Sequence, residues 1–206
     1  DVINFIQILG NVLDLGVPSD STVSLAKLTA TGTKNSTTFL RGDNSFAGAG
    51  ITMADQYRLT TNTAWTTSST TLTAWERADT DGTGAIGSAM SVSSGVFTFP
   101  ITGTYLIQAQ GMVSIANDQR YNTLYIQTTL DNSSYSTASD GHQFIQVTES
   151  NYTLGSIYAS FIFNVSDTSN RKVRLNIQAS GTNGNIGGDT NSNSTAVHFI
   201  RLGDST

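Results

Sequence analysis

The chain has 206 residues, no cysteine, a formal net charge of −5 and only 12% charged residues. The lack of cysteine excludes disulfides and thiolate chemistry. An acidic chain without a basic stripe cannot neutralise phosphates, so we expect no nucleic-acid partner. No apolar run reaches the roughly 18 residues that a membrane-spanning helix needs, so we expect no membrane insertion. A chain of this length suits one sizeable domain with an appendage.

Residues 1–16, DVINFIQILGNVLDLG, predict a short apolar helix. Its apolar residues follow the spacing of a coiled-coil seam at Val2, Ile6, Leu9 and Leu13. Gly16 is typical of the residue that ends a helix. A helix so short and so apolar is marginal in water unless something covers it. Copies of the same helix would cover it in a trimeric coiled coil, or it packs on its own domain.

Residues 17–52 differ in composition: they have few apolar residues, many turn formers and no sustained periodicity. Alone, such a segment buries too little surface to offset the entropy lost on ordering. We therefore expect an extended linker or shaft segment that neighbouring chains order.

From Met53 onward, short strand patterns separated by turn clusters replace the helical pattern. We expect strands at 56–59, 71–77, 88–92, 95–99, 104–115, 121–130, 142–148, 154–165, 172–179 and 195–202. Many short strands without interleaved helices predict an all-β fold, an antiparallel jelly-roll sandwich over residues 53–206.

Three of these strands carry apolar residues on both faces. The alternation in 104–115, 154–165 and 195–202 places one apolar set toward the core and leaves a second set on the opposite face, which includes Leu106, Met112, Tyr158, Ile162 and Ile200. The second sheet of a sandwich covers only one face. Another subunit is therefore the expected cover for the other face.

The stretch GVFTFPITGTY resembles the G-x-F-x-x-P-x-x-G-x-Y signature of the C1q and tumour-necrosis-factor-like jelly roll. The match falls on Gly95, Phe97, Pro100, Gly103 and Tyr105. The closing stretch STAVHFIRLGD is similar to the last strand of that family. The resemblance covers about residues 53–206. It departs from the family in 131–152, which is longer and more polar, and in the absence of collagen-like repeats.

A second resemblance lies upstream, in TKNSTTFLRGDNSFA. This stretch is similar to the S-T-T-F-L-R-G-D-G-T-W linker of bacteriophage tail-fibre and related virion proteins, with Asn-Ser-Phe at 44–46 in place of Gly-Thr-Trp. Together the two resemblances imply a homotrimeric phage fibre that ends in a C1q-like knob. They also imply that the N-terminal part contacts other virion proteins.

The resemblance further implies where a receptor would bind. The turn 100–103, the segment 131–141 and the loop 181–194 would share the distal end, while 166–170 faces the shaft. The distal loops offer Tyr135 as a sugar-stacking ring and a set of hydrogen-bonding side chains. The candidate receptor-binding residues are Asn132, Tyr135, Asn183, Asn185, Asp189 and Asn191.

Other motifs give weaker signals. Arg-Gly-Asp at 41–43 is short, arises by chance and sits inside the linker motif, so we expect no integrin ligand. The stretch 79–84, DTDGTG, holds too few carboxylates for a calcium loop, and a turn is expected. Ser-Asp-Gly-His at 139–142 is adjacency within a turn, not the geometry of a catalytic triad. We therefore expect no catalytic residue, no metal site and no cofactor.

The expected function is structural and adhesive, not enzymatic. The chain would be the distal knob of a phage tail fibre in the extracellular virion, and it would bind a glycan or a protein on the host cell surface. A head-attached fibre or a capsid decoration protein is the alternative. A fibre-borne polysaccharide depolymerase would need a pair of carboxyl groups as acid and base, and no such pair is evident.

Overall fold

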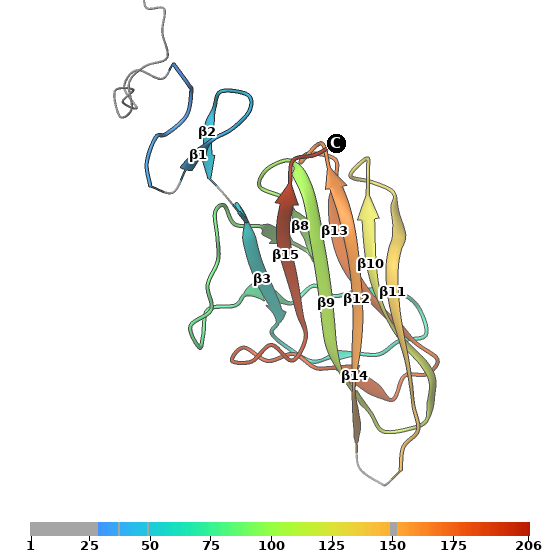
Figure 1. Ribbon diagram of the computed structural model, residues 1–206. Helices are drawn as coiled ribbons and strands as arrows, with labels where there is room; N and C mark the ends of the chain where they lie inside the picture. The colour runs from blue at the N-terminus through green and yellow to red at the C-terminus, as the bar shows by residue number, and fades with distance from the viewer. Residues whose placement is uncertain (1–28, 37, 49, 149–151) are drawn as a thin grey trace, which may run out of the picture. The chain divides into compact units, whose positions relative to one another are not determined.

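The computed structural model describes residues 29–36, 38–48, 50–148 and 152–206 (Figure 1). The helix expected at 1–16 lies outside the described residues. The chain divides into two compact units between Gly50 and Ile51, close to the expected start of the knob at residue 53. Within the described ranges, no helix is long and apolar enough to cross a membrane.

The first unit contains a β-hairpin of β1 (Thr38–Leu40) and β2 (Phe46–Gly48). Its turn holds the Arg-Gly-Asp triplet and then Asn44, whose φ of 61° is left-handed. The Asp43 Oδ1 accepts hydrogen bonds from the Ser45 hydroxyl at 2.6 Å and from the Ser45 backbone N at 3.1 Å. These bonds lower the pKa of the Asp43 carboxyl. The expected extended linker therefore folds back here, and the triplet serves as a turn.

The second unit is a sandwich of two antiparallel sheets (Figure 1). Sheet I runs in the order β12-β9-β15-β3-β6, and β14 pairs with one end of β9 and carries β4 at the edge. Its strands are β3 (Ala54–Leu59), β4 (Thr63–Ala64), β6 (Trp75–Arg77), β9 (Gly103–Ile115), β12 (Thr153–Val165), β14 (Gly184–Ile186) and β15 (Ala196–Gly203).

Sheet II runs in the order β11-β10-β13-β8-β7, and β5 pairs with β13. Its strands are β5 (Thr70–Thr71), β7 (Ser91–Ser93), β8 (Val96–Thr98), β10 (Gln119–Thr129), β11 (Tyr135–Ile145) and β13 (Lys172–Ala179). No helix interrupts the strands in the described part of the chain. The expected all-β antiparallel sandwich is confirmed.

The core lies between the sheets and is centred on a group of aromatic rings. The ring of Phe97 lies 5.2 Å from that of Tyr57, 5.5 Å from that of Trp75 and 5.0 Å from that of Phe199, measured between centroids. Such tilted and edge-to-face pairs add about 0.5–1.5 kcal/mol each beyond the burial of their area. Phe97 comes from sheet II and Phe199 from sheet I, so these contacts fasten the two layers together.

The signature residues have structural roles in this core. Gly95 has a φ of +81°, and a Cβ there would collide with the Leu72 carbonyl oxygen. A Cβ on Gly103 would collide with the Gly203 carbonyl oxygen and the Arg201 Nε. Tyr105 is fully buried, and its hydroxyl donates to the Ile101 carbonyl at 2.8 Å. The signature therefore marks two close backbone approaches and a buried, hydrogen-bonded ring.

The largest difference from the expected strands concerns β11. It begins at Tyr135, whereas the sequence pattern predicts a strand from residue 142. The added residues are mostly small and polar, and β11 is the edge strand of sheet II. An edge strand made of Ser, Thr and Asp lacks the alternating apolar side chains that reveal a strand in a sequence.

Candidate functional site

Sheet I has one face toward sheet II and an opposite face, most of which the described part of the domain leaves uncovered. We call this opposite face the outer face. Strand register places the outer-face side chains in rows across β3, β15, β9 and β12. One row is apolar and consists of Ala54, Ile200, Leu106 and Ile162. The next row is polar and consists of Gln56, His198, Gln108 and Ser160. On the outer face, a row of apolar side chains therefore lies beside a row of side chains that can form hydrogen bonds.

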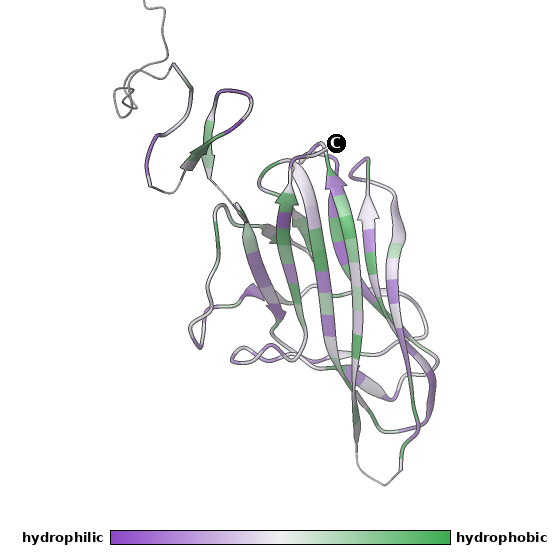
Figure 2. Ribbon diagram, in the orientation of Figure 1, coloured by the Kyte–Doolittle hydropathy of each residue, from purple (hydrophilic) through white to green (hydrophobic). Residues whose placement is uncertain are grey.

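Hydrophobic residues recur along β9, β12 and β15 (Figure 2), and several large apolar side chains on the outer face are exposed. Ile162 is 59% exposed and Tyr158 is 51% exposed, and Leu154 and Leu202 are also exposed. Side chains of this kind clustered on one sheet face mark an interaction surface more often than free solvent surface. The expectation that β9, β12 and β15 carry apolar residues on both faces is confirmed.

Two glutamines interrupt the apolar side chains of β9 on this face. The Gln108 Nε2 donates to the Tyr158 hydroxyl at 2.7 Å, across the β9–β12 pair. The Gln110 Nε2 donates to the Asn193 carbonyl at 3.1 Å. Gln108 thus fixes the Tyr158 ring on the outer face, and Gln110 ties the strand to the loop before β15.

His198 lies in the polar row, between Gln56 and Gln108. It lines a shallow cavity of about 260 Å³ together with Asp55, Gln108 and Ile200. Burial lowers the pKa of His198 below its ordinary value of 6.5, because a charged imidazolium loses hydration there. A neutral His198 is therefore the form that suits the folded domain at pH 7.

We expect the stability of the protein to fall as the pH drops from about 7.5 to about 5.5. Because the pKa of His198 is lower in the folded state, the unfolded chain binds the proton more readily in this range. The stabilisation is present above pH 6.5 and is lost as the pH falls toward the folded-state pKa. The measurement is the Tm at both pH values for wild type and His198→Gln. An equal loss of Tm in both proteins would contradict this role, and His142→Gln is the control.

The six candidate receptor-binding residues lie at two opposite ends of the sandwich, not at one. Gly103 pairs with Val165, while Ile115 at the other end of β9 pairs with Thr153 and Gly184. The turn 100–103 therefore lies at the same end as 166–170, which we call the Gly103 end. The expectation that these two turns lie at opposite ends is wrong. The antiparallel pairing of β9 with β12 requires their adjacent turns to meet.

The Gly103 end holds Asn132 and Tyr135. The turn between β10 and β11 is organised by Asp131, which accepts hydrogen bonds from Thr129, Ser133 and Ser134. These bonds, led by that of the Ser134 backbone, hold the pKa of Asp131 far below its usual value. The Asn132 backbone N donates to Asn170 at 2.9 Å, which joins this turn to the loop 166–170.

The ring of Tyr135 is already partly engaged. The Arg174 guanidinium lies 4.1 Å from its centroid and covers one face in a cation–π contact. Arg174 is itself held by Gln127, to which its Nε donates at 2.9 Å. Tyr135 is therefore better placed to order sheet II than to stack on a sugar with that face.

The opposite end, which we call the Ile115 end, holds Asn183, Asn185, Asp189 and Asn191 in the region around β14 and the following loop (Figure 1). Asn183 and Asn191 are exposed, and Asn185 lies within β14. The Asp189 Oδ1 accepts hydrogen bonds from the backbone N of Asn191 at 2.6 Å and of Ser192 at 3.1 Å. Asp189 thereby shapes the loop that presents Asn191 to solvent.

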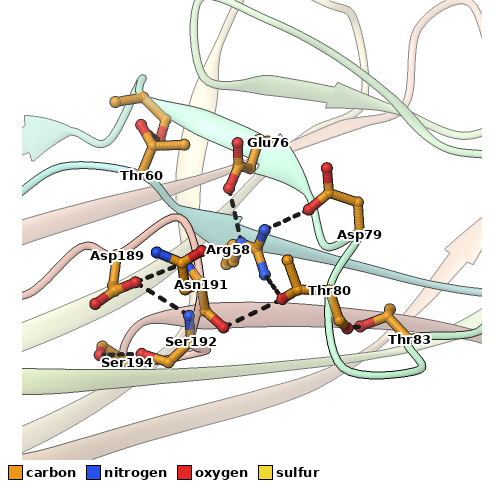
Figure 3. Close-up of polar contacts among 11 residues, drawn as sticks. Arg58, Thr60, Glu76, Asp79, Thr80, Thr83, Asp189, Asn191, Ser192 and Ser194 are labelled. Carbon is orange, nitrogen blue, oxygen red and sulfur yellow. Dashed lines mark hydrogen bonds and ion pairs between the residues drawn. The ribbon is translucent and has the colours of Figure 1, made fainter.

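A polar pocket lies beside this loop and was not apparent from the sequence (Figure 3). It has a volume of about 410 Å³ and lies between the loops 79–84 and 189–194. We call it the Arg58 pocket. Its lining residues include Gln56, Arg58, Thr80, Asp81, Thr83, Asn191 and Asn193. The two polar loops that line it are more than a hundred residues apart in the chain.

The Arg58 side chain connects the elements around this pocket through hydrogen bonds and ion pairs (Figure 3). Its side chain is only 2% exposed, and its Nε donates to Glu76 at 2.7 Å. The Nη2 donates to Asp79 at 2.5 Å and the Nη1 to the Thr80 hydroxyl at 2.8 Å. The hydrogen bond with Glu76 is the main reason that the pKa of Arg58 is raised. One buried guanidinium thus holds β3, β6 and the loop 79–84 together.

The loop 79–84 forms the turn that the sequence predicts. Asp81 and Gly82 have φ values of 54° and 75°, and the Thr83 hydroxyl donates to the Thr80 carbonyl at 2.6 Å. Among the described residues, no group of three His, Cys, Asp or Glu side chains could hold a metal ion. The Thr80 hydroxyl donates to the Asn191 carbonyl at 3.1 Å, which links this turn to the second loop.

The Ser-Asp-Gly-His stretch lies on β11, away from this pocket. The His142 Nε2 contacts the Asp140 carboxylate, and the Nδ1 lies 3.0 Å from the Thr123 hydroxyl. Both ring nitrogens therefore have neighbours other than Ser139. The arrangement lacks the serine–histidine contact that a catalytic triad requires.

No family model matches the sequence, and no curated protein matches it. Among solved structures, murine APRIL at pH 5.0 is 12% identical, with a TM-score of 0.53, and the match covers 73% of this chain and 98% of that chain. Eiger TNF from S. frugiperda is 13% identical, with a TM-score of 0.56 over 76% of this chain and 96% of that one. The second unit has a TNF-like jelly-roll fold. The fold expected from the signature is therefore confirmed.

Proposed function

We propose that the chain forms a homotrimer whose jelly-roll units are the adhesive knob of a bacteriophage tail fibre. The outer face of sheet I is the observation that carries this proposal. Ile162 is exposed in a single chain, and it lies in register with Leu106 and Ile200 on neighbouring strands. Another copy of the same domain would bury this row and pair the polar row beside it. The number three and the virion origin rest on the two sequence resemblances.

The proposed trimer has no catalytic role. It presents three copies of each loop to a receptor on the host cell, a glycan or a protein. If the receptor sites can be engaged together, multivalency raises a weak single-site affinity by about 10²–10⁴-fold. The residues before Gly50 would join the knob to the rest of the extracellular virion particle through other virion proteins.

The proposal is tested by the solution mass of the chain and by competition for host cells. We expect multi-angle light scattering to give three times the 21.8 kDa of one chain at micromolar concentration. We expect the purified trimer, added in excess, to slow the adsorption of the parent phage. A stable monomer would refute the assembly. A trimer that leaves adsorption unchanged would refute the adhesive role.

A further inference from the structure

We propose that the Arg58 pocket binds an uncharged saccharide; this rests on the proposed function and gives its receptor a chemical class. The pocket holds about 410 Å³, within the range of about 300–1,000 Å³ that small-molecule sites occupy. Of the two loops that flank it, 189–194 carries Asp189 and Asn191, two of the candidate receptor-binding residues. Its size suits one or two sugar rings.

The lining of the pocket matches the hydroxyl groups of a sugar. The side-chain amides of Asn191 and Asn193 offer both donors and acceptors, and the Thr80 and Thr83 hydroxyls, whose hydrogens are donated to backbone carbonyls, can still accept. A sugar hydroxyl likewise donates one hydrogen bond and accepts others. Among the described residues, none that lines the pocket is aromatic or a large aliphatic, so an apolar ligand would gain little there.

The pocket walls are held in place before any ligand arrives. A chain of hydrogen bonds runs from Arg58 to the Thr80 hydroxyl and on to the Asn191 carbonyl, which ties β3 to both loops (Figure 3). Asp189 fixes the second loop through the backbone N of Asn191 and of Ser192. A site ordered in advance loses less entropy on binding, which matters most for weak, polar ligands.

The charges that line the pocket favour a neutral sugar over an acidic one. Arg58 and Asp81 are the charged residues that line the pocket, and Arg58 is already paired with Glu76 and Asp79. A uronic or sialic acid would bring its own carboxylate into this pocket. Glu76 and Asp79 already neutralise the Arg58 guanidinium there, and the Asp81 carboxylate would lie close to the ligand. Repulsion and desolvation would then oppose binding. A neutral hexose or acetamido sugar meets no such penalty.

The test is saturation-transfer NMR on the full chain with matched sugars. Glucose, galactose, mannose and N-acetylglucosamine are the neutral probes, and glucuronate and galacturonate are their charged counterparts. We expect transfer to at least one neutral sugar, with a Kd of about 1 mM or weaker, and a signal at least several-fold smaller for the uronates. Absence of transfer to all four neutral sugars, or stronger transfer to the uronates, would overturn the proposal.

Variants locate the site. We expect Asn191→Ala combined with Asn193→Ala to abolish the transfer, while Asn170→Ala, at an exposed position of the loop 166–170 at the Gly103 end, leaves it unchanged. Asp81→Asn keeps a residue that tolerates the left-handed φ of 54° and removes the nearby charge, so the uronate signal should rise relative to glucose. Transfer that survives the double variant would place the ligand elsewhere.

The solution mass of each variant separates this proposal from the proposed function. A trimer that blocks phage adsorption and binds none of the neutral sugars would refute the saccharide pocket alone. A monomer that binds a neutral sugar through Asn191 and Asn193 would refute the trimer alone.

Discussion

Ile162→Asp is expected to convert the proposed trimer into folded monomers. Ile162 is 59% exposed in a single chain, so the carboxylate is hydrated when the chain is alone and folding is little affected. In a trimer, each copy would instead lose about 1.5–3 kcal/mol of apolar burial and would have to dehydrate a charge next to Leu106. Because the change occurs in every copy, we expect the measured mass to fall to the 21.8 kDa of one chain.

Two control variants make this result specific to the outer face. Ile162→Val keeps an apolar side chain and is expected to remain trimeric. Leu130→Asp places the same charge on an equally prominent side chain, 63% exposed, in the turn after β10, and it should also remain trimeric. Light scattering measures the mass, and circular dichroism reports whether each variant is folded. A trimeric Ile162→Asp protein would show that another surface holds the copies together.

The strands with the strongest apolar alternation were predictable almost to the residue. The patterns at 104–115 and 154–165 correspond to β9 (Gly103–Ile115) and β12 (Thr153–Val165). Both strands are long, and their more buried inner-face side chains alternate with outer-face ones, so the period of two is visible in the sequence. The same alternation revealed the outer face, because its second apolar set has no partner within the domain.

The short and polar elements were not predictable in this way. β4 and β14 have two and three residues, and β14 consists of Gly184, Asn185 and Ile186. Such strands are held by pairing with a neighbour that is distant in the sequence. Their existence therefore depends on register, which no local pattern reveals. The arrangement of the turns at the two ends was missed for the same reason.

The candidate site was only partly predictable. The polar loop that holds Asp189 and Asn191 could be recognised from its composition. Arg58 gave no signal, because an arginine in an alternating strand is expected to point into solvent. It is buried because the loop 79–84 and the residues near Asn191 come together over it, and that contact joins segments 111 residues apart.

Glu76→Gln is expected to destabilise the protein strongly, because it leaves the buried Arg58 guanidinium without its main counter-ion. Glu76 is 32% exposed, whereas Asp79 is 74% exposed and is therefore better screened by water. Breaking a buried ion pair is costly, and we expect the Tm to fall by about 10 °C. Asp79→Asn removes the more exposed partner, and we expect a fall of only about 2–3 °C.

The double variant Arg58→Met with Glu76→Gln tests whether the buried charge of Arg58 causes this loss of stability. If the penalty comes from an uncompensated buried cation, removing the cation should restore part of the Tm lost in Glu76→Gln. Thermal unfolding followed by circular dichroism measures all three variants against the wild type. Equal Tm values for Glu76→Gln and Asp79→Asn would contradict the assignment of Glu76 as the main partner. A double variant less stable than Glu76→Gln would mean that Arg58 stabilises the fold mainly through Thr80 and the loop 79–84, not through its charge.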